Sequence, residues 1–204
     1  MAKTAELREM VLATGNRKKL EEINRITGSM GITLRTLTEF PGFPEVVEDA
    51  DTFEGNALKK AREICAFTGL AALADDSGLE VDALNGAPGV YSARYAGEDA
   101  TDAENVRKLL SELSRTDREK SARFHCVIAL VLPDGTEKVF DGRVEGRIGE
   151  AEQGHNGFGY DPVFFPEGHD RTFAEMDATE KDSMSHRGRA LEKFREYLQE
   201  INKP

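Results

Sequence analysis

The sequence is poor in positive charge, in cysteine and in tryptophan. Its 204 residues include 27 Lys or Arg and 38 Asp or Glu, so the formal net charge at pH 7 is −11. A general nucleic-acid-binding protein needs a basic surface, which argues against that class. A small anionic ligand remains compatible with the negative net charge if positive side chains gather at its binding site or a metal ion binds it there. Cys65 and Cys126 form no CxxC pair, so the sequence predicts neither a disulfide framework nor a zinc site, and a reducing cytoplasm fits.

Segments that would place the chain in a membrane or export it are also lacking. The longest apolar run, Cys126–Leu132, is far shorter than the roughly 20 residues that span a bilayer. The charged segment Met1–Glu9 does not resemble a signal peptide. Because 39% of the residues are hydrophobic and apolar runs occur throughout, we expect a core rather than disorder. The length predicts one domain, or one body with a small lobe.

Helical and extended patterns alternate early in the chain, and a hairpin follows in the middle. This order predicts an α/β fold with a mixed sheet. Helices are expected from Arg17 to about Met30, from a Thr52 cap to Thr68, from the capping box Thr101–Glu104 onward, and from about Ser185 to Ile201. Strands are expected at Met10–Ala13, Thr33–Leu37, Ala71–Ala74, Leu79–Leu84, Arg123–Leu132, Thr136–Arg147 and Pro162–Phe165.

The segment Thr14–Lys19 links the first predicted strand to the first predicted helix. Backbone N–H groups and the positive end of the helix dipole would point at this turn, and Gly15 would let an anion approach. Lys18 and Lys19 oppose the dipole, which prefers acids there, and this unfavourable placement indicates an anionic ligand. The alternative is an Asn16 cap followed by a solvated basic face. The segment is not a P-loop, because G-x-x-x-x-G-K-[ST] is absent.

Two adjacent carboxylates, Asp75 and Asp76, follow the predicted strand Ala71–Ala74. Open α/β sheets bind ligands at the carboxyl ends of their strands. The two charges repel each other unless a cation intervenes, and Mg²⁺ prefers carboxylate, phosphate and water oxygens. The acidic loop 39–51 would bring another carboxylate. The alternative is a turn at Asp75–Gly78 whose side chains bond their own backbone, beside a solvated loop.

The glycine-rich segment Gly154–Asp161 surrounds one aromatic residue, Phe158. Its glycines free the backbone, so Phe158 would be exposed as a stacking surface while Asp161 accepts a hydrogen bond from a ring N–H. The alternative is a hairpin loop with Phe158 in the core, where phenylalanine usually lies.

The segment Lys181–Gly188 gathers three donors, Lys181, His186 and Arg187, in a chain short of positive charge. The alternative is a Ser185 cap of the last helix with His186 as a surface histidine.

Together these motifs resemble the inosine triphosphate pyrophosphatase family. The matching stretches occur in the family's order between about Met10 and Leu198, and five weak motifs in order are highly specific. They are Leu12–Asn16, Ala74–Leu79, Gly86–Arg94, Gly157–Pro162 and Ser185–Gly188. One departure is Gly55, which stands where the family usually has Glu, immediately before Asn56.

The resemblance implies an elongated α/β fold of two lobes around a central mixed β-sheet with flanking helices, with the substrate in the cleft between the lobes. It also implies a homodimer. The implied activity is Mg²⁺-dependent hydrolysis of ITP, dITP and XTP to the monophosphate and pyrophosphate, which removes these nucleotides from the cytoplasmic pool.

The resemblance further implies roles for the residues singled out above. Asp76 would bind the metal ion together with Glu48, with Glu45 as the alternative second carboxylate. Asp76 would also activate the attacking water, with Asp75 beside it. Phe158 would stack on the purine, and Lys181, His186 and Arg187 would recognise the 6-oxo group. The remaining substrate-binding residues would be Thr14, Gly15, Asn16, Arg17, Lys18 and Lys19 at the triphosphate, and Ser77, Gly159, Tyr160 and Asp161 elsewhere.

Two other functions are less compatible with the sequence. A nucleotide-binding regulator with the same fold and no turnover has no need of a water-activating carboxylate, so Asp75, Asp76 and Lys19 argue against it. A nicotinamide-dependent oxidoreductase is disfavoured because no strand is followed by G-x-G-x-x-G.

Overall fold

The computed structural model describes residues 7–202. Most of the charged segment Met1–Glu9, on which the prediction about a signal peptide rests, lies outside them. The described chain forms two compact units. The first contains residues 7–76, 127–142 and 187–202, and the second contains Ser77–Cys126 and Arg143–His186. Over residues 7–202, the search for a helix with the length and apolar character of a membrane span finds none.

The strands confirm the predicted mixed sheet. Within the described residues the strand order is β2-β1-β3-β4-β5-β6. β1 runs parallel to both β2 and β3, whereas β5 and β6 are antiparallel. The strands are β1 Glu9–Ala13, β2 Thr33–Thr36, β3 Ala72–Val81, β4 Ser121–Val131, β5 Glu137–Ile148 and β6 Phe164–Pro166.

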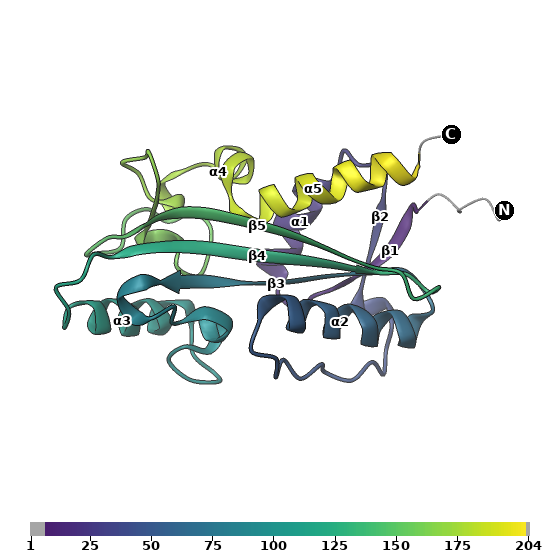
Figure 1. Cartoon of the computed structure of the whole chain (residues 1–204), viewed down its shortest axis with the longest axis horizontal. Coiled ribbons are helices and arrows are strands. Elements are labelled where there is room, and N and C mark those ends of the chain that lie inside the picture. Colours follow the sequence, from purple (N-terminus) through teal and green to yellow (C-terminus); the bar gives the residue numbers. More distant parts are fainter. Residues whose placement is uncertain (1–6, 203–204) are drawn as a thin grey trace. The chain divides into compact units, whose positions relative to one another are not determined.

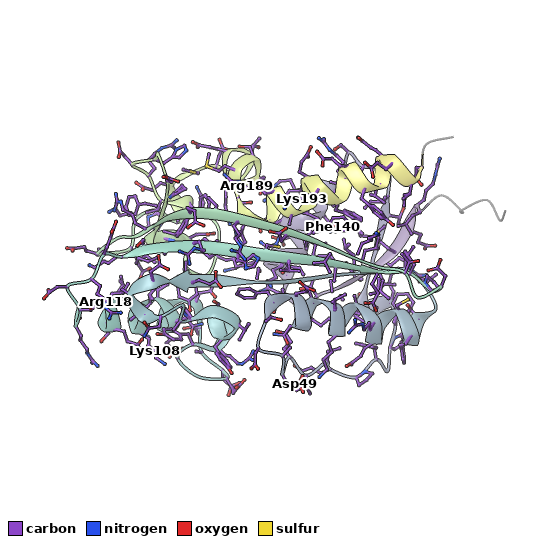
Figure 2. The ribbon with its side chains drawn as sticks, in the orientation of Figure 1. Asp49, Lys108, Arg118, Phe140, Arg189 and Lys193 are labelled. Carbon is purple, nitrogen blue, oxygen red and sulfur yellow. The ribbon has the colours of Figure 1, made fainter. Side chains whose placement is uncertain are left out.

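Three helices belong wholly or almost wholly to the first unit: α1 Arg17–Thr27, α2 Phe53–Thr68 and α5 His186–Ile201. Figure 1 shows α2 on one side of the strands and α1 and α5 on the other. Apolar side chains of these helices are buried, as the helical periodicity predicted. Phe140 of β5, labelled in Figure 2, packs on Phe194 and Tyr197 of α5 with ring centroids 5.5 and 5.6 Å away.

The predicted helix caps are confirmed. The Asn16 side chain accepts hydrogen bonds from the backbone N–H groups of Lys18 and Lys19, and the Thr52 side chain accepts one from Gly55. Gly69 ends α2 in the left-handed conformation, which costs glycine least.

The second unit contains α3 Asp102–Leu113 and α4 Ala178–Met184. Its core joins Leu79 of β3, Leu109 of α3, Phe124 of β4 and Phe164 of β6. The capping box of Thr101 and Glu104 is present as predicted. Both cysteines of the chain are buried thiols.

The structure corrects the prediction at Asp75–Gly78. These residues neither end a strand nor form a turn, because β3 runs without a break from Ala72 to Val81. Asp, Ser and Gly locally favour turns. Here β3 lies between β1 and β4 in the sheet, and its hydrogen bonds to these neighbours outweigh the local preference.

One helix boundary differs from the predictions, because α1 ends at Thr27 rather than near Met30. α5 spans His186–Ile201, close to the predicted range. The short helix α4 was not predicted, because its sequence has no apolar stripe. Ser185 lies between α4 and α5.

Candidate active site

Asp75 and Asp76 point to opposite faces of the sheet, as successive strand residues do. Asp75 forms ion pairs with Lys19 of α1 and Arg187 of α5, whereas Asp76 lies near Lys60 of α2. These helices lie on the two sides of the strands (Figure 1). The adjacent carboxylates therefore have different electrostatic surroundings.

The Asp75 carboxylate is completely buried and paired with two cations. Its Oδ1 atom lies 2.6 Å from Lys19 Nζ, and its Oδ2 atom lies 2.9 Å from Arg187 Nε. Burial raises the pKa of Asp75, but Arg187 and Lys19 together lower it well below its usual value. Burial and Arg187 lower the pKa of Lys19, but the carboxylates of Asp75 and Asp76 outweigh them, so the pKa of Lys19 is raised. Both groups stay ionised at neutral pH.

Arg187 is held by a second carboxylate, that of Glu22 on α1. The Glu22 side chain bonds Arg187 Nη1, and both side chains are buried. Sequence reasoning missed Glu22. These two carboxylates take hydrogen bonds from three nitrogens of the guanidinium. The predicted contact of Arg187 with a purine base stays a prediction.

Asp76 shares a cation with Glu48. Lys60 Nζ lies 2.8 Å from Glu48 Oε1 and 3.8 Å from Asp76 Oδ1, and it donates to the backbone oxygen of Asp75 at 2.7 Å. Burial raises the pKa of Asp76, and Lys60 and Lys19 only partly offset this. A buried carboxylate with a raised pKa is suited to accept a proton from water.

The loop that carries Glu48 is fixed to α2. The Asn56 side chain accepts a hydrogen bond from the N–H of Ala50 at 2.9 Å and donates one to its carbonyl at 3.3 Å. Asp49, labelled in Figure 2, pairs with Lys59. Gly55 allows the loop at Ala50 to lie close to α2, because a Cβ at position 55 would lie 2.7 Å from Ala50 Cβ.

The donors at Asp76 and Glu48 fit a magnesium ion. Both are carboxylates, and they already gather around one positive charge, the Lys60 ammonium. In residues 7–202, no cluster of three or more His, Cys, Asp or Glu side chains is arranged to hold a metal. Mg²⁺ commonly uses one or two carboxylates and completes its shell with substrate phosphates and water. These two residues would thus hold the ion together with a phosphorylated ligand.

The Thr14–Lys19 turn has part of its backbone satisfied internally. Asn16 takes the N–H groups of Lys18 and Lys19, and the Thr14 side chain accepts from the N–H of Asn16 at 3.1 Å. Arg17 pairs on the surface with Glu21, and Gly15 is exposed. The structure thus shows the predicted Asn cap, and binding of an anion at this turn stays a prediction.

The second unit holds the predicted aromatic segment. Asp161 Oδ2 accepts hydrogen bonds from the N–H of Phe158 at 2.8 Å and from Lys181 Nζ at 2.7 Å. Lys181 Nζ lies 5.1 Å from the centroid of the partly exposed Phe158 ring. Gly157 is required here, because a Cβ would lie 2.0 Å from Asp161 Oδ2. Phe158, Asp161 and Lys181 therefore form one cluster.

Neighbouring elements position this cluster. Gly159 donates its N–H to Asp102 at 3.0 Å, and the Tyr160 hydroxyl donates to the backbone oxygen of Ser92 at 2.8 Å. Ser92 lies in the motif Gly86–Arg94, which the sequence left without a chemical role. The motif thus supports the aromatic segment.

His186 is also buried in this unit, and its ring stacks on Phe124 with centroids 4.7 Å apart. The alternative of a surface histidine was wrong. Ser77, the remaining predicted contact, lies on β3 and is partly exposed.

Sequence reasoning missed Glu22, Asn56 and Lys60, which are all buried. Asn56 and Lys60 lie among the apolar positions of α2, whereas Glu22 lies among other charged residues of α1. Lys60 follows Phe53 and precedes Ile64 on the buried stripe of α2. A polar side chain inside an apolar helical stripe is the signal that would have identified Asn56 and Lys60.

Comparisons with known proteins agree with the motifs. The model of the Ham1 family matches residues 10–197. The dITP/XTP pyrophosphatase of Geobacter sulfurreducens is 52% identical over 190 residues, covering 93% of this chain and 96% of the relative. That of Desulfotalea psychrophila is 48% identical over 194 residues, covering 95% and 86%. The structure of a HAM1 protein from Coxiella burnetii has a TM-score of 0.88 at 47% identity, covering 95% of this chain and 99% of that one. The chain therefore belongs to the Ham1 family.

Proposed function

We propose that this protein hydrolyses ITP, dITP and XTP to the corresponding monophosphate and pyrophosphate. The names of the relatives, dITP/XTP pyrophosphatases, support this substrate class. The observation that carries the proposal is the buried Asp76 carboxylate beside Lys60 and Glu48. Asp76 provides a proton acceptor, and Asp76 and Glu48 together provide carboxylate oxygens for a metal ion. The sequence of the chain is 52% identical to that of one of these enzymes.

In the proposed reaction, a water oxygen attacks the α-phosphorus. The bond between that phosphorus and the oxygen bridging to the β-phosphorus breaks, and pyrophosphate leaves with the bridging oxygen and the bonding electron pair. The attacking water gives its proton to Asp76. Mg²⁺ held by Asp76 and Glu48 would offset phosphate charge and align the reacting groups. Lys60 holds the Glu48 carboxylate beside β3.

The Lys19 ammonium and the turn at Thr14–Lys19 are proposed to bind the triphosphate. Lys19 remains charged in the folded protein, because Asp75 raises its pKa. Its side chain is 17% exposed, whereas that of Asp75 is fully buried. Lys19 can therefore meet a ligand from solvent while its partner stays in place.

The cluster of Phe158, Asp161 and Lys181 is proposed to bind the base, with His186. Phe158 offers a partly exposed ring, and Lys181 is a buried donor beside it. A 6-oxo group accepts hydrogen bonds from such donors. The amino group of adenine does not, and a buried donor left without an acceptor rejects the wrong base strongly.

The direct test is incubation of the protein with ITP, dITP, XTP and ATP in the presence of Mg²⁺, with the phosphate products separated by ion chromatography. We expect pyrophosphate and monophosphate from the first three nucleotides and much slower turnover of ATP. Orthophosphate as the product, or equal use of ATP, would contradict the proposal. Binding of ITP without any turnover would instead support a non-catalytic nucleotide-binding regulator. The homodimer and the cytoplasmic location stay predictions from the sequence.

A further inference from the structure

Glu22 is a buried carboxylate that the proposed reaction does not use. It lies on α1 with 2% of its surface exposed. Buried glutamates are rare unless they are paired, and buried ion pairs often add little stability compared with apolar residues of the same size. Stability alone therefore does not account for Glu22, and the residues to which it is connected indicate a further role.

Glu22 begins a line of four alternating charges. It pairs with Arg187, Arg187 pairs with Asp75, and Asp75 pairs with Lys19. The side chains of Glu22, Arg187 and Asp75 are 3%, 1% and 0% exposed, whereas that of Lys19 is 17% exposed. Lys19 is therefore the member of the line that reaches solvent, and the other three form its fixed support.

The two ends of this line lie on one helix. Lys19 and Glu22 are three residues apart on α1, so they share a face of the helix. Arg187 and Asp75 come from α5 and β3 and close the connection between them. Removal of the Glu22 charge would thus alter the position of the Lys19 ammonium through Arg187 and Asp75.

The geometry at Asp75 shows how this would happen. Lys19 Nζ lies 2.6 Å from Asp75 Oδ1, and Arg187 Nη2 lies 3.4 Å from the same oxygen. Glu22 bonds the third guanidinium nitrogen, Nη1, and so holds the guanidinium from a second direction. Without the Glu22 charge, the guanidinium would bond both Asp75 oxygens more closely and compete with Lys19 for Oδ1.

We propose that Glu22 is a positioning residue that, through Arg187 and Asp75, holds the Lys19 ammonium in place for a triphosphate ligand. The proposal rests on the proposed function in one respect, namely that Lys19 binds the triphosphate.

The test measures binding of inorganic tripolyphosphate with Mg²⁺ by titration calorimetry, a readout that requires no turnover. Glu22→Gln should raise the Kd about tenfold, the size of one charge-assisted contact. The control is Glu192→Gln on α5, which removes a carboxylate from an exposed ion pair with Arg195 and should leave the Kd unchanged. An unchanged Kd in Glu22→Gln, or no binding to the wild-type protein, overturns the proposal.

The Lys19→Met background separates positioning from a general structural effect. If Glu22 acts through Lys19, adding Glu22→Gln to Lys19→Met should leave the Kd as it is in Lys19→Met alone. A further loss of affinity in the double variant overturns the proposal. The double variant removes one negative and one positive charge, so the balance of charge is kept. If Glu22→Gln alone does not fold, the Kd of the double variant compared with that of Lys19→Met still tests the proposal. Failure of the wild-type protein to release pyrophosphate from ITP contradicts the proposed function. The Kd values for tripolyphosphate still test the role of Glu22, because binding requires no turnover.

Discussion

Asp75 and Asp76 are sequence neighbours whose carboxylates pair with different helices. Asp75 is fixed by Lys19 and Arg187, whereas Asp76 lies with Glu48 around Lys60. The strand geometry of β3 separates them, because successive side chains point to opposite faces. This separation gives the two residues different roles, one in support and one in chemistry.

The Asp76→Asn variant should lose turnover while keeping its fold. The amide cannot take the proton of the attacking water, so kcat for ITP should fall by roughly 10²–10⁴-fold. Steady-state pyrophosphate release and thermal unfolding measure the two quantities. Asp141→Asn, which removes a carboxylate from an exposed pair with Lys193, is the matched control and should keep full activity. A rate close to the wild-type rate in Asp76→Asn would show that another group accepts the proton.

The Asp75→Asn variant should be markedly less stable. It removes the carboxylate that pairs with both Lys19 and Arg187, and removing one partner of a buried ion pair costs about 3–5 kcal/mol. Urea unfolding should show this loss, whereas Asp141→Asn should change the free energy of unfolding by less than about 1 kcal/mol. Equal stability of the two variants would mean that the charges at Asp75 contribute no net stability.

Acid should destabilise the wild-type protein through the same residue. The pKa of Asp75 is lower in the folded chain than its ordinary value of 3.8, because Arg187 and Lys19 outweigh its burial. The unfolded chain therefore binds this proton more readily, and the stability that Asp75 supplies is present above about pH 4 and falls as the pH drops below it. Melting temperatures measured without metal from pH 7 to pH 3 should fall less steeply below pH 4 for Asp75→Asn than for the wild type. Parallel curves would contradict this.

The local parts of the fold were predictable from the sequence. Asn16 and Thr52 cap the starts of α1 and α2, and Gly69 ends α2, as expected from their side chains and from the conformational freedom of glycine. Such caps are predictable because they depend on residues only a few positions apart. The continuous strand at Asp75–Gly78 was not predictable in this way. Its residues locally favour a turn, and their extended conformation depends on pairing of β3 with β1 and β4, strands that lie distant in the sequence.

The candidate site shows the same limit. Asp75, Asp76, Lys19 and Arg187 stood out in the sequence, but the pairing among them did not, and neither Glu22 nor Lys60 stood out. Arg187 reaches Asp75 across 112 residues and Glu22 across 165, and no local pattern encodes such contacts. Glu22 itself is hidden in the sequence among the other charged residues of α1.

Gly55 should resist substitution even though it lies in the first turn of a helix. Alanine would gain about 1 kcal/mol of helix propensity. Its Cβ would, however, lie 2.7 Å from Ala50 Cβ and 3.0 Å from Thr52 Oγ1, and such overpacking costs about 1–3 kcal/mol. We expect Gly55→Ala to be less stable in urea than the wild type and its loop to be cut faster by protease. Glu54→Ala, whose side chain is exposed in the same turn, is the control. A more stable Gly55→Ala would show that the loop moves aside without loss.

The Asp161→Asn variant should separate recognition of the base from binding of phosphate. Asp161 holds Lys181 Nζ at 2.7 Å and the N–H of Phe158 at 2.8 Å, and the buried Lys181 would lose its charged partner. The KM for ITP should rise about tenfold, which corresponds to the loss of one charge-assisted hydrogen bond. The Kd for inorganic tripolyphosphate, which has no base, should stay the same. Equal losses for both ligands would place the effect of Asp161 on the fold rather than on the base, because a ligand without a purine cannot sense the stacking ring.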